Sequence, residues 1–248
     1  MIWKWDWILK PQPRPEGGNV SRILAATIAI LFAAFGYLVQ NQVRIPPNTL
    51  PWEPIDLNAS PGWIAHWQLN QLVSQDQRCR IALAKTSQSV VLLKNRKIDD
   101  ACGFQDVVRI DRTPVTFTPK TTATCALSAG LYWYQGLLQT AAQTQMHTRL
   151  VRIDQLGTFA CRNVNSEVDG SRSEHATANA IDVAAFHFSD GRVITVAKDY
   201  GKNSAEGKFL DAAHDAACTI FNTVLGPRYN QLHENHFHLD MGSYRICR

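Results

Sequence analysis

Histidines and acidic residues gather in two short segments of the C-terminal third of the chain. The first, residues 173–182, reads SEHATANAID, and the second, residues 233–240, reads HENHFHLD. Side chains two residues apart in a β-strand point to the same face. A strand through the second segment would therefore place His236, His238 and Asp240 on one face and the apolar residues that alternate with them on the other. The apolar face suits a core, and the polar face would line a cleft or meet solvent.

Asp182 shares one face of a second expected strand with small and apolar neighbours, from Ala180 to Phe186. A buried acid is costly unless something pairs with it, and a cation is the natural partner. Zinc binds imidazole nitrogen and carboxylate oxygen in tetrahedral geometry, and a catalytic zinc site keeps one position for water. Two histidines and one carboxylate from the two segments would supply three ligands. The remaining histidine on that face is then a candidate general base.

The same residues carry a resemblance to known proteins. Ser173-x-His175-x6-Asp182, followed by His236-x-His238, resembles the signature of the LAS metallopeptidases, which include lysostaphin-type and D-Ala-D-Ala-type peptidoglycan peptidases. The stretch from Cys161-Arg162 onwards resembles the bacterial extensin-like C-terminal domain family, a branch of that group, and the similarity covers most of residues 62–248. The resemblance implies a zinc peptidase that hydrolyses amide bonds in the stem or cross-link peptides of peptidoglycan.

The resemblance also implies a role for each matching residue. His175, Asp182 and His238 match the zinc ligands. His236 matches the histidine that orients or deprotonates the zinc-bound water, and His233 is a candidate to stabilise the transition state.

Further residues complete the expected site. Ser173 matches the serine of the pattern and is assigned to substrate binding. Arg162 would meet a developing oxyanion, with an ordinary salt bridge as the alternative. Asp240 would accept a hydrogen bond from a ligand histidine, and Glu174 is expected to be solvated. Asn235 stands three residues before His238, where the dipeptidase branch carries glutamate, so His236 inherits the role of base.

Two other functions stay open. The domain would be a wall-binding module if it kept the fold without turnover, or a periplasmic metal-binding protein if the histidines served storage or delivery. His236 argues against both, because it exceeds the needs of a three-ligand site yet lies on the ligand face.

An uncharged apolar run, Ile23–Val39, predicts a membrane helix near the N-terminus. A cleaved signal peptide and a buried helix are the alternatives. The run follows a long polar stretch and is not followed by a small-x-small cleavage site, which favours an uncleaved anchor. Lysines and arginines lie mostly before the run, which predicts a cytoplasmic N-terminus and a periplasmic domain on a single-pass inner-membrane protein.

The six cysteines all lie after residue 78 and form no CxxC pair, which predicts disulfides in an oxidising compartment. Fifteen pairings are possible, and the spacing does not choose among them. The formal net charge of +4 comes without a dense basic block, so nucleic acid is not an expected partner. The oligomeric state and protein partners have no signal in the sequence.

Periodicity and turn residues predict an α+β domain with a largely antiparallel sheet and flanking helices, preceded by the transmembrane helix. The expected organisation is a cytoplasmic tail (1–22), the anchor (23–39), a Pro-rich linker (40–61) and the LAS-type catalytic domain (62–248). Helices are expected over 63–84, 121–144 and 207–225. Strands are expected over 89–93, 107–110, 149–154, 157–162, 180–188, 193–198 and 232–241.

Overall fold

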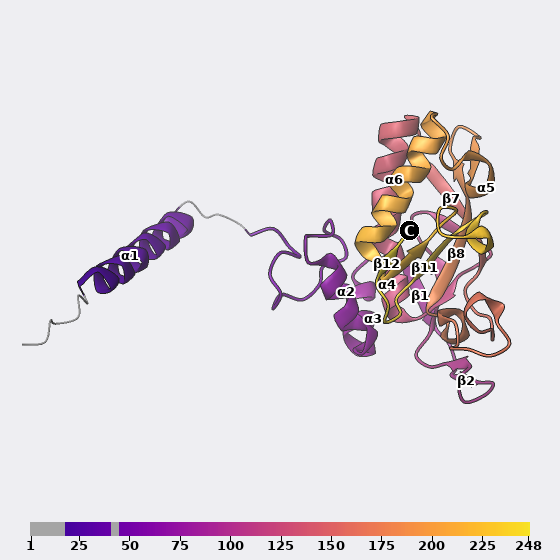
Figure 1. Cartoon of the computed structure of the whole chain (residues 1–248), viewed down its shortest axis with the longest axis horizontal. Coiled ribbons are helices and arrows are strands. Elements are labelled where there is room, and N and C mark those ends of the chain that lie inside the picture. Colours follow the sequence, from indigo (N-terminus) through magenta and orange to yellow (C-terminus); the bar gives the residue numbers. More distant parts are fainter. Residues whose placement is uncertain (1–17, 41–44) are drawn as a thin grey trace, which may run out of the picture. The chain divides into compact units, whose positions relative to one another are not determined.

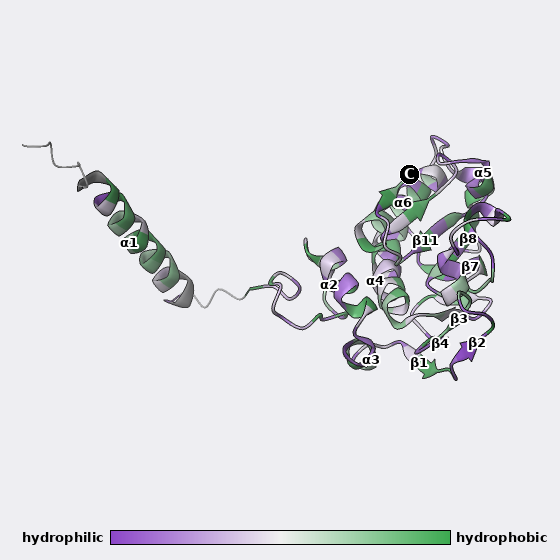
Figure 2. Ribbon diagram, turned by 60° about the horizontal axis from the view of Figure 1, so that its bottom comes forward, coloured by the Kyte–Doolittle hydropathy of each residue, from purple (hydrophilic) through white to green (hydrophobic). Residues whose placement is uncertain are grey.

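The computed structural model describes residues 18–40 and 45–248, which fall in two compact units, 1–46 and 47–248. The tail prediction lies almost wholly outside the described residues. The first unit contains helix α1 (Gly18–Gln40), which is coloured apolar along most of its length in Figure 2. Its window Val20–Tyr37 has a mean hydropathy of 1.8, so α1 is long and apolar enough to span a membrane. At 1.5 Å per residue it is about 34 Å long, against roughly 30 Å for a bilayer core.

The second unit is an α+β domain built on a seven-stranded sheet (Figure 1). The sheet order is β12-β10-β11-β8-β7-β5, and β9 also pairs with β8. Pairing is antiparallel in the middle of the sheet and parallel only at the outer pairs β10–β12 and β5–β7, which agrees with a largely antiparallel prediction. Its strands are β5 (Thr116–Thr118), β7 (Leu150–Gly157), β8 (Ala180–Phe188), β9 (Val193–Thr195), β10 (Thr223–Leu225), β11 (Phe237–Asp240) and β12 (Ile246–Cys247).

Two long helices pack side by side on one face of this sheet, α4 (Cys125–Ala141) and α6 (Ala205–Ile220) (Figure 1). Leu131 of α4 and Phe209 of α6 share one core with the inward side chains of the central strands. From β11, Phe237 and Leu239 enter this core, as their alternation with polar residues predicts. The polar side chains of β8 and β11 therefore emerge on the sheet face that the two helices leave uncovered.

Smaller elements surround this core. The helices are α2 (Ala65–Val73), α3 (Asp76–Ala84) and α5 (Val196–Asp199), together with a π-turn at Ala142–Met146 and 3₁₀ turns at Val164–Ser166, Glu174–Thr177 and Gln231–His233. The remaining strands are β1 (Ser89–Leu92), β4 (Val108–Arg112) and β6 (Thr122–Ala123) in one small sheet, and β2 (Arg96–Lys97) with β3 (Gly103–Phe104) in another.

Several predicted boundaries are wrong. The helix expected over 63–84 is broken between α2 and α3, and the helix expected over 207–225 ends at Ile220 and gives way to β10. The hairpin expected over 149–162 is one strand, β7, because the residues around Leu156 continue the ladder with β8. The strand expected over 193–198 ends at Thr195. The strand expected over 232–241 begins only at Phe237.

A β-bulge changes the alternation that the sequence predicts for β8. Asp154 of β7 pairs with Ala185, and Gln155 pairs with Val183, so Ala184 is the extra, unpaired residue of the bulge. The expectation that Phe186 shares the face of Asp182 is therefore wrong. The core residues of the strand lie two apart on either side of the bulge, at Ile181 and Val183 before it and at Phe186 and Phe188 after it.

The folded unit starts at Pro47, inside the segment that its prolines predict as a linker. Asn48 is buried, and its amide donates to the carbonyl oxygens of Asp56 and Ser60. Leu57 joins the core, and the indole of Trp133 donates to the carbonyl of Ala59. Residues 47–61 are therefore packed against the domain.

All six cysteines form disulfides, as their number and spacing predict. The pairs are Cys79–Cys125, Cys102–Cys161 and Cys218–Cys247. The first joins α3 to the start of α4, the second fixes the residue before Arg162, and the third ties β12 to α6.

Candidate metal centre

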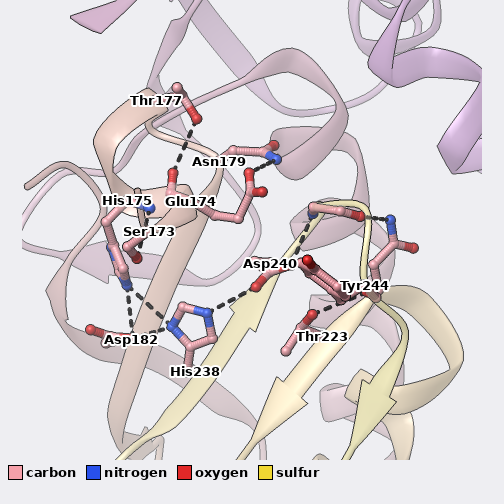
Figure 3. A network of polar contacts seen from close by, with 12 residues as sticks. Ser173, Glu174, His175, Thr177, Asn179, Asp182, Thr223, His238, Asp240 and Tyr244 are labelled. Carbon is pink, nitrogen blue, oxygen red and sulfur yellow. Dashed lines mark hydrogen bonds and ion pairs between the residues drawn. The ribbon is translucent and has the colours of Figure 1, made fainter. Parts of the chain in front are cut away.

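Three side chains from separate segments converge on the uncovered face of the sheet (Figure 3). His175 Nε2 lies 3.2 Å from Asp182 Oδ1 and 3.2 Å from His238 Nδ1, and His238 Nδ1 lies 2.9 Å from Asp182 Oδ1. All three residues are buried. The two segments that the sequence singled out thus meet at a triangle of potential ligand atoms, all within 4.8 Å of one another.

The geometry and chemistry of this triangle fit zinc. Ligands bound tetrahedrally at 2.0–2.2 Å lie about 3.3 Å apart, so the observed separations need to widen only slightly. Two imidazoles and one carboxylate are also the donors that zinc prefers. Burial opposes ionisation of Asp182, but hydrogen bonds from His175 and His238 outweigh it and hold the pKa of the carboxyl well below its ordinary value. The centre therefore contains a buried anion whose partners all face a single point.

A capped turn presents His175 to the centre. Ser173 begins the 3₁₀ turn Glu174–Thr177, and its hydroxyl accepts from the backbone N–H of His175 at 3.4 Å. Ala178 ends the turn in the left-handed conformation, at φ 57°, which glycine adopts at lower cost. Ser173 also lines the cleft described below.

Asn179 holds this turn against its neighbours. Its side-chain oxygen accepts from Thr124, the N-cap of α4, and its amide donates to Glu174 Oε2 at 2.7 Å (Figure 3). The expectation that Glu174 is simply solvated is therefore wrong, because it is half-buried and paired. A Cβ at position 242 would lie 2.5 Å from Glu174 Oε1, so any residue other than Gly242 would push the Glu174 side chain out of this place.

Asp240 orients His238 from behind, as its alternation along β11 predicts. His238 Nε2 lies 3.0 Å from Asp240 Oδ2, while Asp240 Oδ1 accepts from the backbone N–H of Gly242. Such a carboxylate fixes the ring and makes the opposite nitrogen a better ligand. Burial disfavours the charged ring, but the hydrogen bonds to Asp182 and Asp240 outweigh it and raise the pKa of His238 to about 9.

His236 stands beside the triangle. Its Nε2 lies 3.6 Å from Asp182 Oδ1, and its Nδ1 lies 2.7 Å from the side-chain oxygen of Asn235. Burial lowers the pKa of His236 against the opposing effect of Asp182, and the nearby His238, His175 and Arg162 lower it further. The ring is therefore neutral near pH 7. Because Nδ1 donates to Asn235, the nitrogen that faces the centre carries a lone pair.

His233 is held in the same way, by Asn230, whose side-chain oxygen lies 2.7 Å from Nδ1. Burial, with the nearby rings of His236 and His238, lowers the pKa of His233 to about 4. A neutral ring that donates through Nδ1 has only an acceptor at Nε2. In this tautomer Nε2 of His233 accepts a hydrogen bond from a group in the cleft.

The centre opens into a cleft of about 350 Å³. Arg162 lines it, and its guanidinium lies 3.8 Å from Asp182 Oδ2. Tyr229 and Tyr244 line it as well, with the ring of Tyr229 against His233 at 5.6 Å between centroids. Sequence reasoning missed both tyrosines and Asn230, and it did not foresee that Asn235 holds the ring of His236. Asn230 lies three residues before His233, and Asn235 lies directly before His236. Their contacts with these rings depend on the conformation of a turn, which the periodicity of the sequence does not predict.

A second group of potential ligands, His214, Cys218 and Cys247, is of a different kind. Its two sulfurs form a disulfide, so neither is a thiolate, and thiolate is the form that binds zinc. The remaining three histidines have local contacts: His66 lies 3.2 Å from the amide of Asn70, His187 is paired with Asp154, and His147 ends the turn after α4 in the left-handed conformation.

The comparison with protein families identifies one match. The model for the extensin-like protein C-terminus covers residues 77–248, more than half of the chain, and includes every residue of the candidate centre. No curated protein and no solved structure matches the chain.

Proposed function

Because the chain belongs to the extensin-like C-terminal family, and because of the geometry of its centre, we propose that it is a zinc-dependent peptidase of peptidoglycan. The bonds cleaved are amides of stem or cross-link peptides. One observation carries the proposal: two histidines and an ionised aspartate converge on one point, with a third, neutral histidine beside them that the ligand set does not need. A site for storage or a purely structural site has no use for that histidine.

In this proposal His175, Asp182 and His238 hold the zinc ion. When bound, zinc supplies a water whose pKa is lowered toward about 7 and polarises the scissile carbonyl. Asp240 holds the ring of His238 in the tautomer that leaves Nδ1 free to bind metal.

His236 moves the proton. Asn235 accepts from Nδ1, so Nε2 takes the proton of the attacking water and returns it to the nitrogen of the leaving amine. Its lowered pKa keeps it in the basic form at neutral pH. The guanidinium of Arg162, at the edge of the cleft, stabilises the negative charge that develops on the carbonyl oxygen. His233 accepts a hydrogen bond from the substrate through Nε2, and Ser173 borders the bound peptide.

The three disulfides and α1 support a location for this activity. Disulfides persist in oxidising compartments, and α1 is apolar enough to anchor the chain. We therefore place the domain in the periplasm, anchored to the inner membrane through residues 23–39, with the N-terminus in the cytoplasm. Peptidoglycan is the polymer within reach of such a domain.

The test uses the full chain purified in detergent. Metal analysis is expected to find one zinc per chain, and incubation with isolated peptidoglycan is expected to release soluble muropeptides, identified by mass. Asp182→Asn is expected to lose the zinc, and His236→Ala to keep it and lose the release. A chain without zinc overturns the metal proposal. Bound zinc without release from the parent chain identifies a wall-binding module or a metal-binding protein instead.

A further inference from the structure

A second groove lies on the domain away from the metal centre, between residues 51–55 and the helices α2 and α3. Its volume is about 420 Å³. Trp52 and Trp67 line it with 76% and 44% of their surfaces exposed, so two indole rings are available to a ligand. Exposed tryptophans together in one groove are a feature of binding sites, because the ring offers a large apolar surface at little entropic cost.

The polar lining of this groove is dominated by amides. Gln68, Gln71 and Gln75 contribute them from α2 and the residue before α3. Glu53, Arg78 and Lys85 add charges of both signs. Such a lining suits a neutral ligand that both donates and accepts hydrogen bonds.

Gln68 is the observation that points to a ligand. It is only 3% exposed, and within the described part of the chain neither its Nε2 nor its Oε1 has a hydrogen-bond partner. A buried polar group left without a partner costs roughly 1–3 kcal/mol. Both amide atoms are shielded from solvent, so the Gln68 side chain has to turn toward the groove for a bound molecule to supply both a donor and an acceptor.

We propose that this groove binds a glycan strand. The apolar face of a pyranose ring stacks on an indole, and each sugar hydroxyl both donates and accepts, which satisfies both atoms of the Gln68 amide. A proline-rich peptide, the other common occupant of a tryptophan-lined groove, has carbonyl acceptors but few N–H donors. It would leave Gln68 Oε1 without a partner.

The choice of glycan rests on the proposed function, since peptidoglycan peptides branch from a glycan strand. Helix α2 relates the two sites. Trp67 and Gln68 line the groove, whereas His66 and Asn70 line a depression on its other side. That depression shares Glu174 and Tyr244 with the cleft of the metal centre. A strand held in the groove would thus keep its peptide branches near the cleft.

The experiment measures binding separately from hydrolysis. The full chain, in a zwitterionic detergent without a sugar headgroup, is titrated calorimetrically with the β-1,4-linked tetramer of N-acetylglucosamine and, in parallel, with a free stem pentapeptide. The tetrasaccharide is expected to bind, and Trp67→Ala and Gln68→Leu are each expected to weaken it at least tenfold. Gln68→Leu has nearly the same shape and removes two unpartnered buried atoms, so its thermal midpoint is expected to hold or rise.

Trp63→Ala is the matched control, because Trp63 is 82% exposed and does not line the groove. It is expected to bind the tetrasaccharide as the parent chain does. Absence of tetrasaccharide binding, or an equal affinity in Gln68→Leu, overturns the proposal, and binding of the pentapeptide to the groove in its place identifies a peptide site. Cleavage of a glycan-free cross-linked peptide without tetrasaccharide binding would refute only this inference and leave the peptidase intact.

Discussion

His238 of β11 lies directly across the ladder from Asp182 of β8, and the nearest atoms of the two side chains are 2.9 Å apart. The pairing is a property of the antiparallel register, because Phe237 and Leu239 must face the core opposite Val183 and Ile181. A slip of β11 by one residue would turn His238 to the opposite face of the sheet from Asp182. The register that buries the core therefore also assembles two of the three proposed ligands.

Neutralising either aspartate that contacts His238 is expected to weaken zinc binding, to a different degree for each. Asp182→Asn removes a ligand and is expected to abolish stoichiometric binding. Asp240→Asn removes only the acceptor behind His238 and is expected to lower zinc affinity about 10–100-fold. Competition with a chromophoric chelator measures both. Equal affinities in Asp240→Asn and the parent chain would contradict the role given to Asp240.

Replacing the proposed base is expected to separate binding from turnover. His236→Ala should keep zinc and lower kcat for muropeptide release by about 10²–10⁴-fold, the usual contribution of a positioned base. His147→Asn is the matched control, since His147 is exposed, lies outside the cleft and has a left-handed backbone that asparagine tolerates. A His236→Ala enzyme with parental kcat would transfer the role to another group.

The metal-free protein is expected to lose stability as the pH rises. The pKa of His238 is raised from about 6.5 to about 9, so its contribution is fully present below pH 6.5 and disappears as the pH rises through 9. The loss amounts to at most about 3 kcal/mol. Urea unfolding of chelator-treated protein between pH 6 and pH 9.5 measures it. Zinc-loaded protein should lack this decline, because the metal replaces the proton, and a flat profile for the metal-free protein would refute the prediction.

Loss of the Cys102–Cys161 disulfide is expected to destabilise the domain by about 4 kcal/mol, from the closure entropy of a loop with a sequence separation of 59. Urea unfolding of the Cys102→Ser, Cys161→Ser double variant tests this. Arg162 follows Cys161 directly, so muropeptide release should fall as well. The Cys218→Ser, Cys247→Ser variant, with a separation of 29, is the comparison and should lose slightly less stability.

A charge in α1 is expected to impair membrane insertion. Leu31→Arg places arginine near the middle of the apolar window and costs about 2.5–3.5 kcal/mol of insertion free energy. Alkaline extraction of membranes should then release part of the protein that is otherwise retained. Leu92→Arg, at an exposed position of β1, should remain in the membrane fraction. Release of the parent chain under the same conditions would refute the anchor.

The sequence by itself determined the chemistry of the centre. Residue type and strand alternation singled out Asp182, His236 and His238, because alternation is local and imidazole and carboxylate are recognisable metal donors wherever they occur. The resemblance to a known family added His175 to this set. The same local rules predicted the α+β class, the apolar N-terminal helix and the disulfides.

Only the tertiary structure decided which atoms meet. The bulge at Ala184, the register of β8 on β11 and the cysteine pairing depend on contacts between distant segments, which periodicity does not encode. The tautomers of His233 and His236 depend on asparagines placed by a turn, and the tryptophan groove depends on the packing of residues 51–55 against α2. These features arise from contacts that form when the chain packs its core. The same packing ends some helices and strands earlier than their local sequence preference predicts.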